Sequence, residues 1–538
     1  MVLAILAFGL GIYVSGAGAR SERALAARYV RDWSRGDFPA MYRLLSPASR
    51  RRWSETAFAA QYAAAADTAT LESIRPGRVG AISGAYVRVP VRARTRIFGT
   101  LREMLQVPIS GGANGPYVAF GGTLLFPGLR PGEQLIRHSV LAARGSILAD
   151  DGTPLAQGPG RTSPIPAVAG EIVGTLGPIP ASERSTYDAL GYPADAQVAQ
   201  DGLELIFQKR LVGRIGGTLL AGHRVLARAP AAPGKTVKTT IDPTLEQAAI
   251  SALGGAYAGM TVIDPKTGGL LALAGLAFSA VQPPGSTMKI VTSTAVLQSG
   301  LATLGTEFPV MTAATIDGYT LHNSDNEACG GTLLNAFAVS CNSVFAPLGA
   351  QLGAQRLVST AQRFGFNHAT GIPGALESTI PSAATIGDAL AVGSSAIGQG
   401  KVLASTLEMA DIGATIADAG RRPIPTLVYG AKPRFVRVTT PKVAGEVQQM
   451  MEAVVEFGTG TAAQIPGVEV AGKTGTAELT NTSSQANATQ DTDAWFVGYA
   501  PVGDPRVVVC ALFPNAGFGG DTAAPAVQQV LVAALGLG

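Results

Sequence analysis

The sequence predicts a multidomain α+β protein. Its 538 residues ordinarily correspond to about three domains. An early segment, residues 20 to 65, has the apolar spacing of helices, whereas Tyr86–Arg94 alternates valine with polar or small neighbours, as a half-buried strand does. Apolar strands and helices then mix from Lys235 to the end. Hydrophobic residues make up 47% of the chain, enough for each unit to bury a core.

The first segment predicts a membrane anchor. Met1–Ala19 has no charged side chain and, as a helix, would span about 28 Å, enough to cross a bilayer core. A cleaved signal peptide is the alternative, because Gly16–Ala19 resembles a small-residue cleavage site. Neither arrangement has its usual basic flank, so we expect the natural start to lie upstream. We favour the uncleaved anchor, which places everything after Arg20 outside the cytoplasm.

The remaining elements follow in order. Leu25, Tyr29 and Trp33 share a helical face and precede the predicted strand, which together predict a small α+β domain. Arg144–Ala156 predicts a strand, an Asp-Gly turn and a second strand. Dense Pro and Gly then lead to a linker at Pro233-Gly234. Beyond it we expect strands in Val262–Leu273, Ala494–Tyr499 and Val507–Phe513, and helices in Ser286–Leu297 and Ala524–Leu535.

Charge and ligand content exclude several classes of function. The 41 Lys+Arg against 37 Asp+Glu leave a net charge of +4, too weak a balance for a nucleic-acid binder. The four histidines are isolated in sequence and the three cysteines form no Cys-x-x-Cys pair, so we expect no metal site. Cys329 and Cys341 could pair in an oxidising compartment. We favour free thiols that pack as small apolar side chains.

A Ser-x-x-Lys motif carries the candidate nucleophile. Ser286-Thr-Met-Lys289 is the only such motif in the chain, and Pro284-Gly285 before it predicts a helix start at Ser286. The i, i+3 spacing puts both side chains on one helical face. A lysine whose pKa is lowered can take the serine proton, and the N–H groups of a helix N-terminus can stabilise an oxyanion.

A Ser-x-Asn motif occurs twice. We prefer Ser340-Cys-Asn342, because it lies in the apolar helical stretch Leu333–Leu352, which can hold a hydroxyl and an amide rigidly towards a cleft. Ser324-Asp-Asn326 lies in a polar loop that we expect to be merely solvated.

A Lys-Thr-Gly motif also occurs twice. Lys266-Thr-Gly268 follows Asp264-Pro265 and is expected to be a hairpin turn. Lys473-Thr-Gly475 enters a Thr-rich strand, where Lys473 offers a cation for a carboxylate and Gly475 would let a ligand approach the backbone. The Walker A pattern Gly467–Thr474 is rejected, because a strand and a polar loop follow it in place of a helix.

In this order the three motifs resemble those of class B penicillin-binding proteins, the membrane-anchored D,D-transpeptidases of peptidoglycan synthesis. Further landmarks similar to that family are Arg144–Ala156, Gly202-Leu-Glu204, Thr240-Ile-Asp242, Asp264–Gly268, Gly398-Gln-Gly400 and Ala494–Pro501. The resemblance implies a penicillin-binding transpeptidase fold, an antiparallel sheet flanked by helices, over residues 236–538. It also implies a β-rich dimerisation or pedestal domain over 136–235 and, from the pattern of Trp33, Gly36-Asp37 and Leu44-Leu45, an NTF2-like domain over 20–135, after the anchor over 1–19.

The resemblance implies catalytic roles for four residues. Ser286 would attack the D-Ala-D-Ala carbonyl and form an acyl-enzyme, with Lys289 as the base. Ser340 would relay a proton to the leaving D-alanine, and Asn342 would hold the substrate amide.

It also implies a binding site for the substrate carboxylate and oxyanion. Lys473 and Thr474, beside Gly475, would bind the terminal carboxylate. The N–H groups of Ser286 and Thr476 would form the oxyanion hole.

The expected reaction ends when an amine from a neighbouring stem peptide attacks the acyl-enzyme and forms a cross-link. β-Lactams would acylate the same serine as covalent inhibitors. The expected partners are peptidoglycan stem peptides, the membrane and a separate membrane glycosyltransferase, with no nucleic acid, no metal and no cofactor. The resemblance places the protein in the bacterial cytoplasmic membrane, single-pass, with its catalytic domain extracytoplasmic.

Three alternative functions use the same motifs. A D,D-carboxypeptidase would use water as the acceptor. A serine β-lactamase would hydrolyse the acyl-enzyme quickly but has no need of the N-terminal 235 residues. A non-catalytic β-lactam sensor would need a cytoplasmic signalling segment, which the sequence does not suggest.

Overall fold

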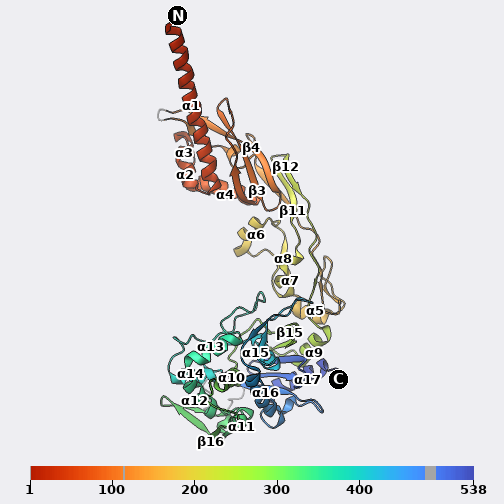
Figure 1. Cartoon of the computed structure of the whole chain (residues 1–538). Helices are drawn as coiled ribbons and strands as arrows, with labels where there is room; N and C mark the ends of the chain where they lie inside the picture. Colours follow the sequence, from red (N-terminus) through yellow and green to blue (C-terminus); the bar gives the residue numbers. More distant parts are fainter. Residues whose placement is uncertain (1, 113–114, 479–491, 538) are drawn as a thin grey trace. The chain divides into compact units, whose positions relative to one another are not determined.

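The computed structural model describes residues 2–112, 115–478 and 492–537, with side chains from residue 18 onward. The chain forms two compact units, coloured along the sequence in Figure 1. Unit 1 comprises Met1–Gly145, Leu176–Ala199 and Gln208–Lys235. Unit 2 comprises Ser146–Thr175, Gln200–Phe207 and Thr236–Gly538. The segment 136–235 therefore contributes to both units.

Unit 1 begins with helices beside an antiparallel sheet. The helices are α1 (Val2–Ser34), α2 (Phe38–Arg43), α3 (Pro47–Arg52) and α4 (Glu55–Ala69). The sheet runs in the order β1 (Leu71–Pro76), β3 (Tyr86–Thr95), β4 (Gly99–Ser110) and β5 (Tyr117–Val118), with β2 (Ile82–Ser83) beside β3. Val87, Val89 and Val91 are buried, which confirms the strand predicted from their alternation. They share one core with Tyr29 and Trp33.

Among the helices that the structure describes, none combines the length and the hydropathy that a membrane-spanning segment requires. The anchor predicted over residues 1–19 lies outside the residues whose side chains are described, except for its last two.

The rest of unit 1 is a second antiparallel sheet and short helices. This sheet has the order β12 (Arg224–Ala229), β11 (Gly216–Ala221) and β6 (Leu135–Val140). The other elements are the pair β9 (Leu176–Pro178) and β10 (Gln197–Ala199), and the helices α6 (Arg184–Leu190) and α8 (Gln208–Leu211).

Unit 2 is built on a five-stranded antiparallel sheet. Its order is β15 (Leu270–Gly275), β14 (Gly259–Ile263), β24 (Val507–Phe513), β23 (Thr492–Ala500) and β22 (Ala471–Glu478). Helices α9 (Pro243–Leu253) and α17 (Ala523–Ala534) pack in one core with Phe496 and Val509. The alternate residues Val497 and Val508 contact Gly413 of α15 (Thr406–Ala417). Both faces of these strands are thus covered, which explains their continuous apolar sequences.

Helices and hairpins complete unit 2. The helices are α5 (Pro166–Ile172), α7 (Gly202–Ile206), α10 (Lys289–Ser299), α11 (Leu333–Ala338), α12 (Asn342–Leu352), α13 (Ala354–Phe364), α14 (Ala389–Ala396) and α16 (Pro441–Glu456). The smaller strand pairs are β16 (Glu307–Met311) with β19 (Cys329–Thr332), β17 (Ala313–Ile316) with β18 (Tyr319–His322), and β20 (Arg421–Pro423) with β21 (Phe435–Arg437). A three-stranded sheet joins β7 (Ile147–Leu148), β8 (Pro154–Ala156) and β13 (Val237–Lys238), which confirms the predicted hairpin at Arg144–Ala156.

Candidate active site

Residues from all three motifs meet at one cavity of unit 2. The cavity has a volume of about 360 Å³, and its lining includes Ser286, Ser340, Thr474 and Thr476. Lys289 and Lys473 lie fully buried against Ser340. The structure therefore brings together residues that are distant in the sequence.

Ser286 lies on a short 3-10 turn, η3 (Gly285–Met288), and α10 begins only at Lys289. The two are continuous, so the predicted helical segment does begin at this point, but its first turn is 3-10 and not α-helical. The turn is held from both sides by backbone, because a Cβ at Gly398 would lie 2.0 Å from Gly285 O and a Cβ at Gly285 would lie 2.8 Å from Thr476 O. Gly285 also has a φ of +52°, which glycine adopts without strain. Among the described residues, Ser286 Oγ makes no hydrogen bond.

Lys289 is surrounded by oxygen atoms of the second motif. Its Nζ donates to Ser340 O at 2.6 Å and to Asn342 Oδ1 at 2.8 Å, and lies 3.2 Å from Ser340 Oγ. Burial, and then the positive charge of Lys473, hold the pKa of Lys289 well below its usual range. These two effects favour a neutral amine, which can accept a proton.

Lys473 lies on β22, the last strand of the sheet. Its Nζ lies 3.0 Å from Ser340 Oγ, 3.0 Å from Thr474 O and 3.4 Å from Thr474 Oγ1. Burial lowers its pKa to about 7. Ser340 Oγ therefore lies between two lysine amines.

Ser340 and Asn342 lie at a break in the predicted helix Leu333–Leu352. The stretch forms two helices, α11 and α12, because Ser340 takes a left-handed conformation with φ +62°. Such a conformation is costly for serine and persists where the surrounding structure fixes it. Asn342 opens α12, and its Nδ2 donates to His322 O at 3.1 Å, so both ends of its amide have partners within the protein.

A disulfide joins Cys329 to Cys341, with their Cα atoms 5.8 Å apart, so the favoured expectation of free thiols is wrong. Cys329 lies on β19 and Cys341 follows Ser340 directly, so the bridge ties the break between α11 and α12 to a neighbouring strand. The remaining cysteine, Cys510, is buried on β24.

Replacing Cys329 and Cys341 together by alanine is expected to lower the free energy of unfolding by about 3 kcal/mol, because the bridge closes a short loop in the unfolded chain. Urea denaturation measures this change, and Cys510→Ala is the control for a lost buried thiol. Alkylation of the oxidised protein under denaturing conditions is expected to modify Cys510 alone. Modification of all three cysteines would contradict the pairing.

Gly475 lies against the protein's own chain, and not against open space for a ligand as predicted. An added Cβ would lie 2.7 Å from Pro284 O, 2.8 Å from Trp495 Cβ and 2.9 Å from Thr287 Cγ2. The space beside this glycine is therefore filled by the chain itself, and not left for a ligand. The absence of a side chain lets β22 lie directly against the turn that carries Ser286.

Gly475→Ala is expected to slow acylation of Ser286 and to destabilise the protein by roughly 1–3 kcal/mol, since it overpacks this contact. The reaction with a chromogenic β-lactam and urea denaturation measure the two effects. Gly503→Ala is the matched control, because a Cβ there meets nothing within 4 Å. Equal acylation rates for both variants would contradict the packing role.

The competing motifs behave differently. Lys266 lies in the predicted hairpin turn and forms an exposed ion pair with Asp504. Ser324–Asn326 is exposed, as expected for a solvated loop, but Ser324 also contributes to the lining of the cavity that holds Ser286. Thr474 continues a strand, as the rejection of the Walker A pattern requires.

Two residues of the site were not predicted. Thr459 Oγ1 lies 2.5 Å from Thr474 Oγ1 and lines the cavity. Asn323 also lines it, accepts a hydrogen bond from Ser343 N at 2.8 Å and so fixes the start of α12. Neither belongs to a recognisable motif, because both act through contacts distant in sequence.

Comparison with known proteins identifies the region that carries the site. Residues 258–532 match the model of the penicillin binding protein transpeptidase domain. The chain is 30% identical over 417 residues to a peptidoglycan D,D-transpeptidase, PbpA, of Mycolicibacterium smegmatis, covering 64% of this chain and 81% of that relative. It is 24% identical to a peptidoglycan D,D-transpeptidase, MrdA, of Acinetobacter baumannii, covering 65% of this chain and 62% of that relative.

Solved structures show the same fold. A crystal structure of PBPA from Mycobacterium tuberculosis matches with a TM-score of 0.59 and 26% identity, covering 73% of this chain and 99% of that one. Penicillin-binding protein A from M. tuberculosis in a ceftriaxone acyl-enzyme complex matches with a TM-score of 0.59 and 26% identity, covering 73% and 98%.

Proposed function

The chain belongs to the penicillin-binding protein transpeptidase family, and from this membership and the geometry of the cleft we propose that it is a peptidoglycan D,D-transpeptidase that acts through a Ser286 acyl-enzyme. The observation that carries the assignment of residues is a hydrogen-bonded series: the amines of Lys289 and Lys473 both contact Ser340 Oγ, and Ser340 lines the same cavity as Ser286. Penicillin and other β-lactams acylate the same serine.

Acylation begins with a proton transfer. Neutral Lys289 donates its two N–H bonds to Ser340 O and Asn342 Oδ1, which leaves its lone pair for a hydroxyl proton. The proton of Ser286 Oγ–H passes to Lys289 as Oγ bonds to the carbonyl carbon of D-Ala-D-Ala. The N–H groups of Ser286 and Thr476 stabilise the oxyanion. Asn342 positions the lysine; the role implied by the resemblance, holding the substrate amide, stays a prediction.

Ser340 delivers the proton that the leaving group needs. In its charged form Lys473 donates to Ser340 Oγ, whose own proton then points towards Lys289 or the leaving amine. As the C–N bond breaks, this hydroxyl passes a proton to D-alanine and regains one from Lys289. Lys473 and Thr474 bind the terminal carboxylate of the substrate, with Thr459 holding the Thr474 hydroxyl. An amine of a second stem peptide then attacks the acyl carbon: the new C–N bond forms the cross-link, the C–Oγ bond to Ser286 breaks, and the proton lost by the amine passes through Lys289 to Ser286 Oγ.

The parts outside the transpeptidase fold support a wall-associated role. We assign residues 20–135 to an NTF2-like domain, because helices α1, α2 and α4 and the antiparallel sheet that follows them share one hydrophobic core rich in aromatic side chains. We assign residues 136–235, which are divided between the two compact units, to a pedestal, and residues 1–19 to an anchor in the cytoplasmic membrane with the catalytic unit outside the cytoplasm. A separate membrane glycosyltransferase supplies the glycan strands.

The full chain, incubated with a stem pentapeptide donor and an amine-bearing stem peptide, is expected to release D-alanine and to form a cross-linked product. Mass spectrometry of the products separates the cross-link from the tetrapeptide that a carboxypeptidase would make with water. A tetrapeptide alone, at every acceptor concentration, would assign carboxypeptidase activity. An acceptor with an acetylated amine is the matched control and is expected to give no cross-link.

A further inference from the structure

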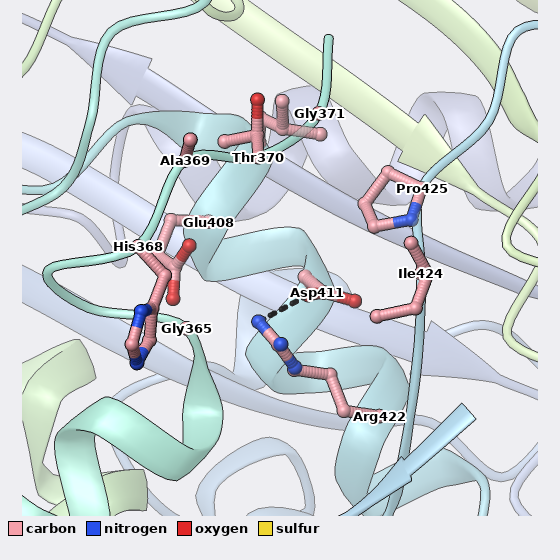
Figure 2. A pocket seen from close by; sticks show the side chains of 11 residues that line it. Gly365, His368, Ala369, Thr370, Gly371, Glu408, Asp411, Arg422, Ile424 and Pro425 are labelled. Atoms are coloured by element: carbon pink, nitrogen blue, oxygen red, sulfur yellow. Dashed lines mark ion pairs between the residues drawn. The ribbon is translucent and has the colours of Figure 1, made fainter. Parts of the chain in front are cut away.

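Unit 2 contains a second cavity, of about 150 Å³, which among the described residues shares no lining residue with the catalytic cleft (Figure 2). Its floor carries Glu408 and Asp411 of α15 and Arg422 of β20. The i, i+3 spacing of the two acidic residues puts both carboxyls on one face of the helix. The other lining residues are Gly365, His368, Ala369, Thr370, Gly371, Leu407, Ile424 and Pro425.

The polar groups of this floor are buried and incompletely paired. Glu408 is 4% exposed and Asp411 2% exposed, yet Glu408 Oε1 and Asp411 Oδ1 have no hydrogen-bond partner among the described residues. Arg422 Nη1 lies 3.6 Å from Asp411 Oδ2, as the dashed line in Figure 2 marks, and donates to Phe364 O at 3.0 Å. Arg422 Nε has no partner in the described structure.

These groups show what the cavity lacks. Two unpaired carboxyl oxygens face a single unpaired N–H, and two carboxyls face one guanidinium. With both carboxyls ionised, the floor is short of hydrogen-bond donors and of one positive charge. Burial raises the pKa of Glu408 to about 8 and outweighs the opposing effect of Arg422, so a cation that binds here must take the place of the Glu408 proton.

We propose that this cavity binds a small organic cation, a primary ammonium group on a short aliphatic chain. An ammonium has three N–H donors, enough for Glu408 Oε1 and Asp411 Oδ1. Leu407, Ile424 and Pro425 offer apolar surface for the aliphatic chain. The volume is about that of an engineered cavity that admits benzene, and several times the share of one water.

Two further observations favour an organic cation at this place. Among the described residues, no group of three His, Cys, Asp or Glu side chains could hold a metal ion. At Gly365 a Cβ would lie 2.4 Å from both Glu408 Oε1 and Arg422 Nη1, so this glycine keeps the carboxyl accessible from the cavity.

The chain offers a matched control for Glu408. Glu246 is also fully buried, its pKa is also raised to about 8 by burial, and its Oε1 is also unpaired. Its Oε2, however, accepts from Leu273 N at 2.7 Å, and Glu246 lines neither this cavity nor the catalytic one.

Calorimetric titration of the full chain with n-butylammonium chloride at constant ionic strength tests the proposal. We expect one site per chain, with affinity unchanged after the cleft has been acylated by penicillin. Glu408→Gln is expected to weaken binding at least tenfold, whereas Glu246→Gln is expected to bind as the wild type. n-Butanol, which has the same chain without the charge, is expected not to bind.

Three results would overturn the proposal: no binding of n-butylammonium, equal binding by Glu408→Gln, or loss of binding on acylation, which would place the cation in the catalytic cleft. If Glu408→Gln does not fold, Thr370→Trp, at a half-buried lining residue, serves instead and is expected to block binding; undiminished binding would contradict the site. A lysine-containing tripeptide tests the source of the ammonium. Competition supports a peptide-borne amine, and n-butylammonium binding without competition supports a free amine.

Discussion

Ser286→Ala is expected to abolish covalent labelling of the protein by fluorescent penicillin. Among the described residues that line the cavity, no other places a hydroxyl on the turn held between β22 and Gly398. Loss of the nucleophile of a serine enzyme costs about 10⁶ in rate in a well-studied protease, so we expect a reduction of at least about 10⁴-fold. In-gel fluorescence after a long incubation of the full chain measures it.

Ser324→Ala is the matched control for this substitution. Ser324 lines the same cavity and belongs to the competing Ser-x-Asn motif, but it is exposed and contacts neither buried lysine. We expect this variant to label like the wild type and both variants to unfold at the wild-type temperature. Labelling that survives in Ser286→Ala, or is lost in Ser324→Ala, would contradict the assignment of the nucleophile.

The sheet of unit 2 could be predicted from the sequence because its signal is local. Val507–Phe513 and Ala494–Tyr499 are runs of apolar residues bounded by turn residues, and both became strands of the predicted pair. The motif lysines could also be identified, because lysine is rare here and the flanking residues distinguish a turn from a strand.

The remaining features of the site depend on contacts between distant segments. Ser340, in a left-handed conformation, interrupts a stretch whose local sequence is apolar and typical of a helix. The next residue, Cys341, is held by the disulfide to Cys329, which is distant in the sequence. Thr459 reaches Thr474 only because α16 packs on β22. The sequence pattern at Gly475 predicted that a ligand approaches the backbone there, but the space is occupied by the turn that carries Ser286. None of these contacts can be deduced from the spacing of residues in the sequence.

Lys289→Arg is expected to reduce acylation by penicillin by about 10³-fold or more, although it keeps a cation in the site. An arginine stays protonated at every accessible pH and cannot accept the proton of Ser286. The guanidinium is also larger than the amine that Ser340 O and Asn342 Oδ1 now surround. Stopped-flow or manual measurement of the acylation rate tests the expectation. Lys266→Arg, in the exposed hairpin turn, is the matched control and is expected to react normally.

The pH dependence distinguishes loss of a base from loss of packing. In the wild type the neutral fraction of Lys289 rises with pH and saturates above its pKa, which burial and the charge of Lys473 hold well below that of free lysine. Acylation should therefore fall on the acidic side. Lys473→Met removes the second of these effects, so the pKa of Lys289 is expected to rise and the acidic limb to move to higher pH. If the acidic limb of the acylation rate against pH does not move in Lys473→Met, or if Lys289→Arg keeps the wild-type limb, another group is the base.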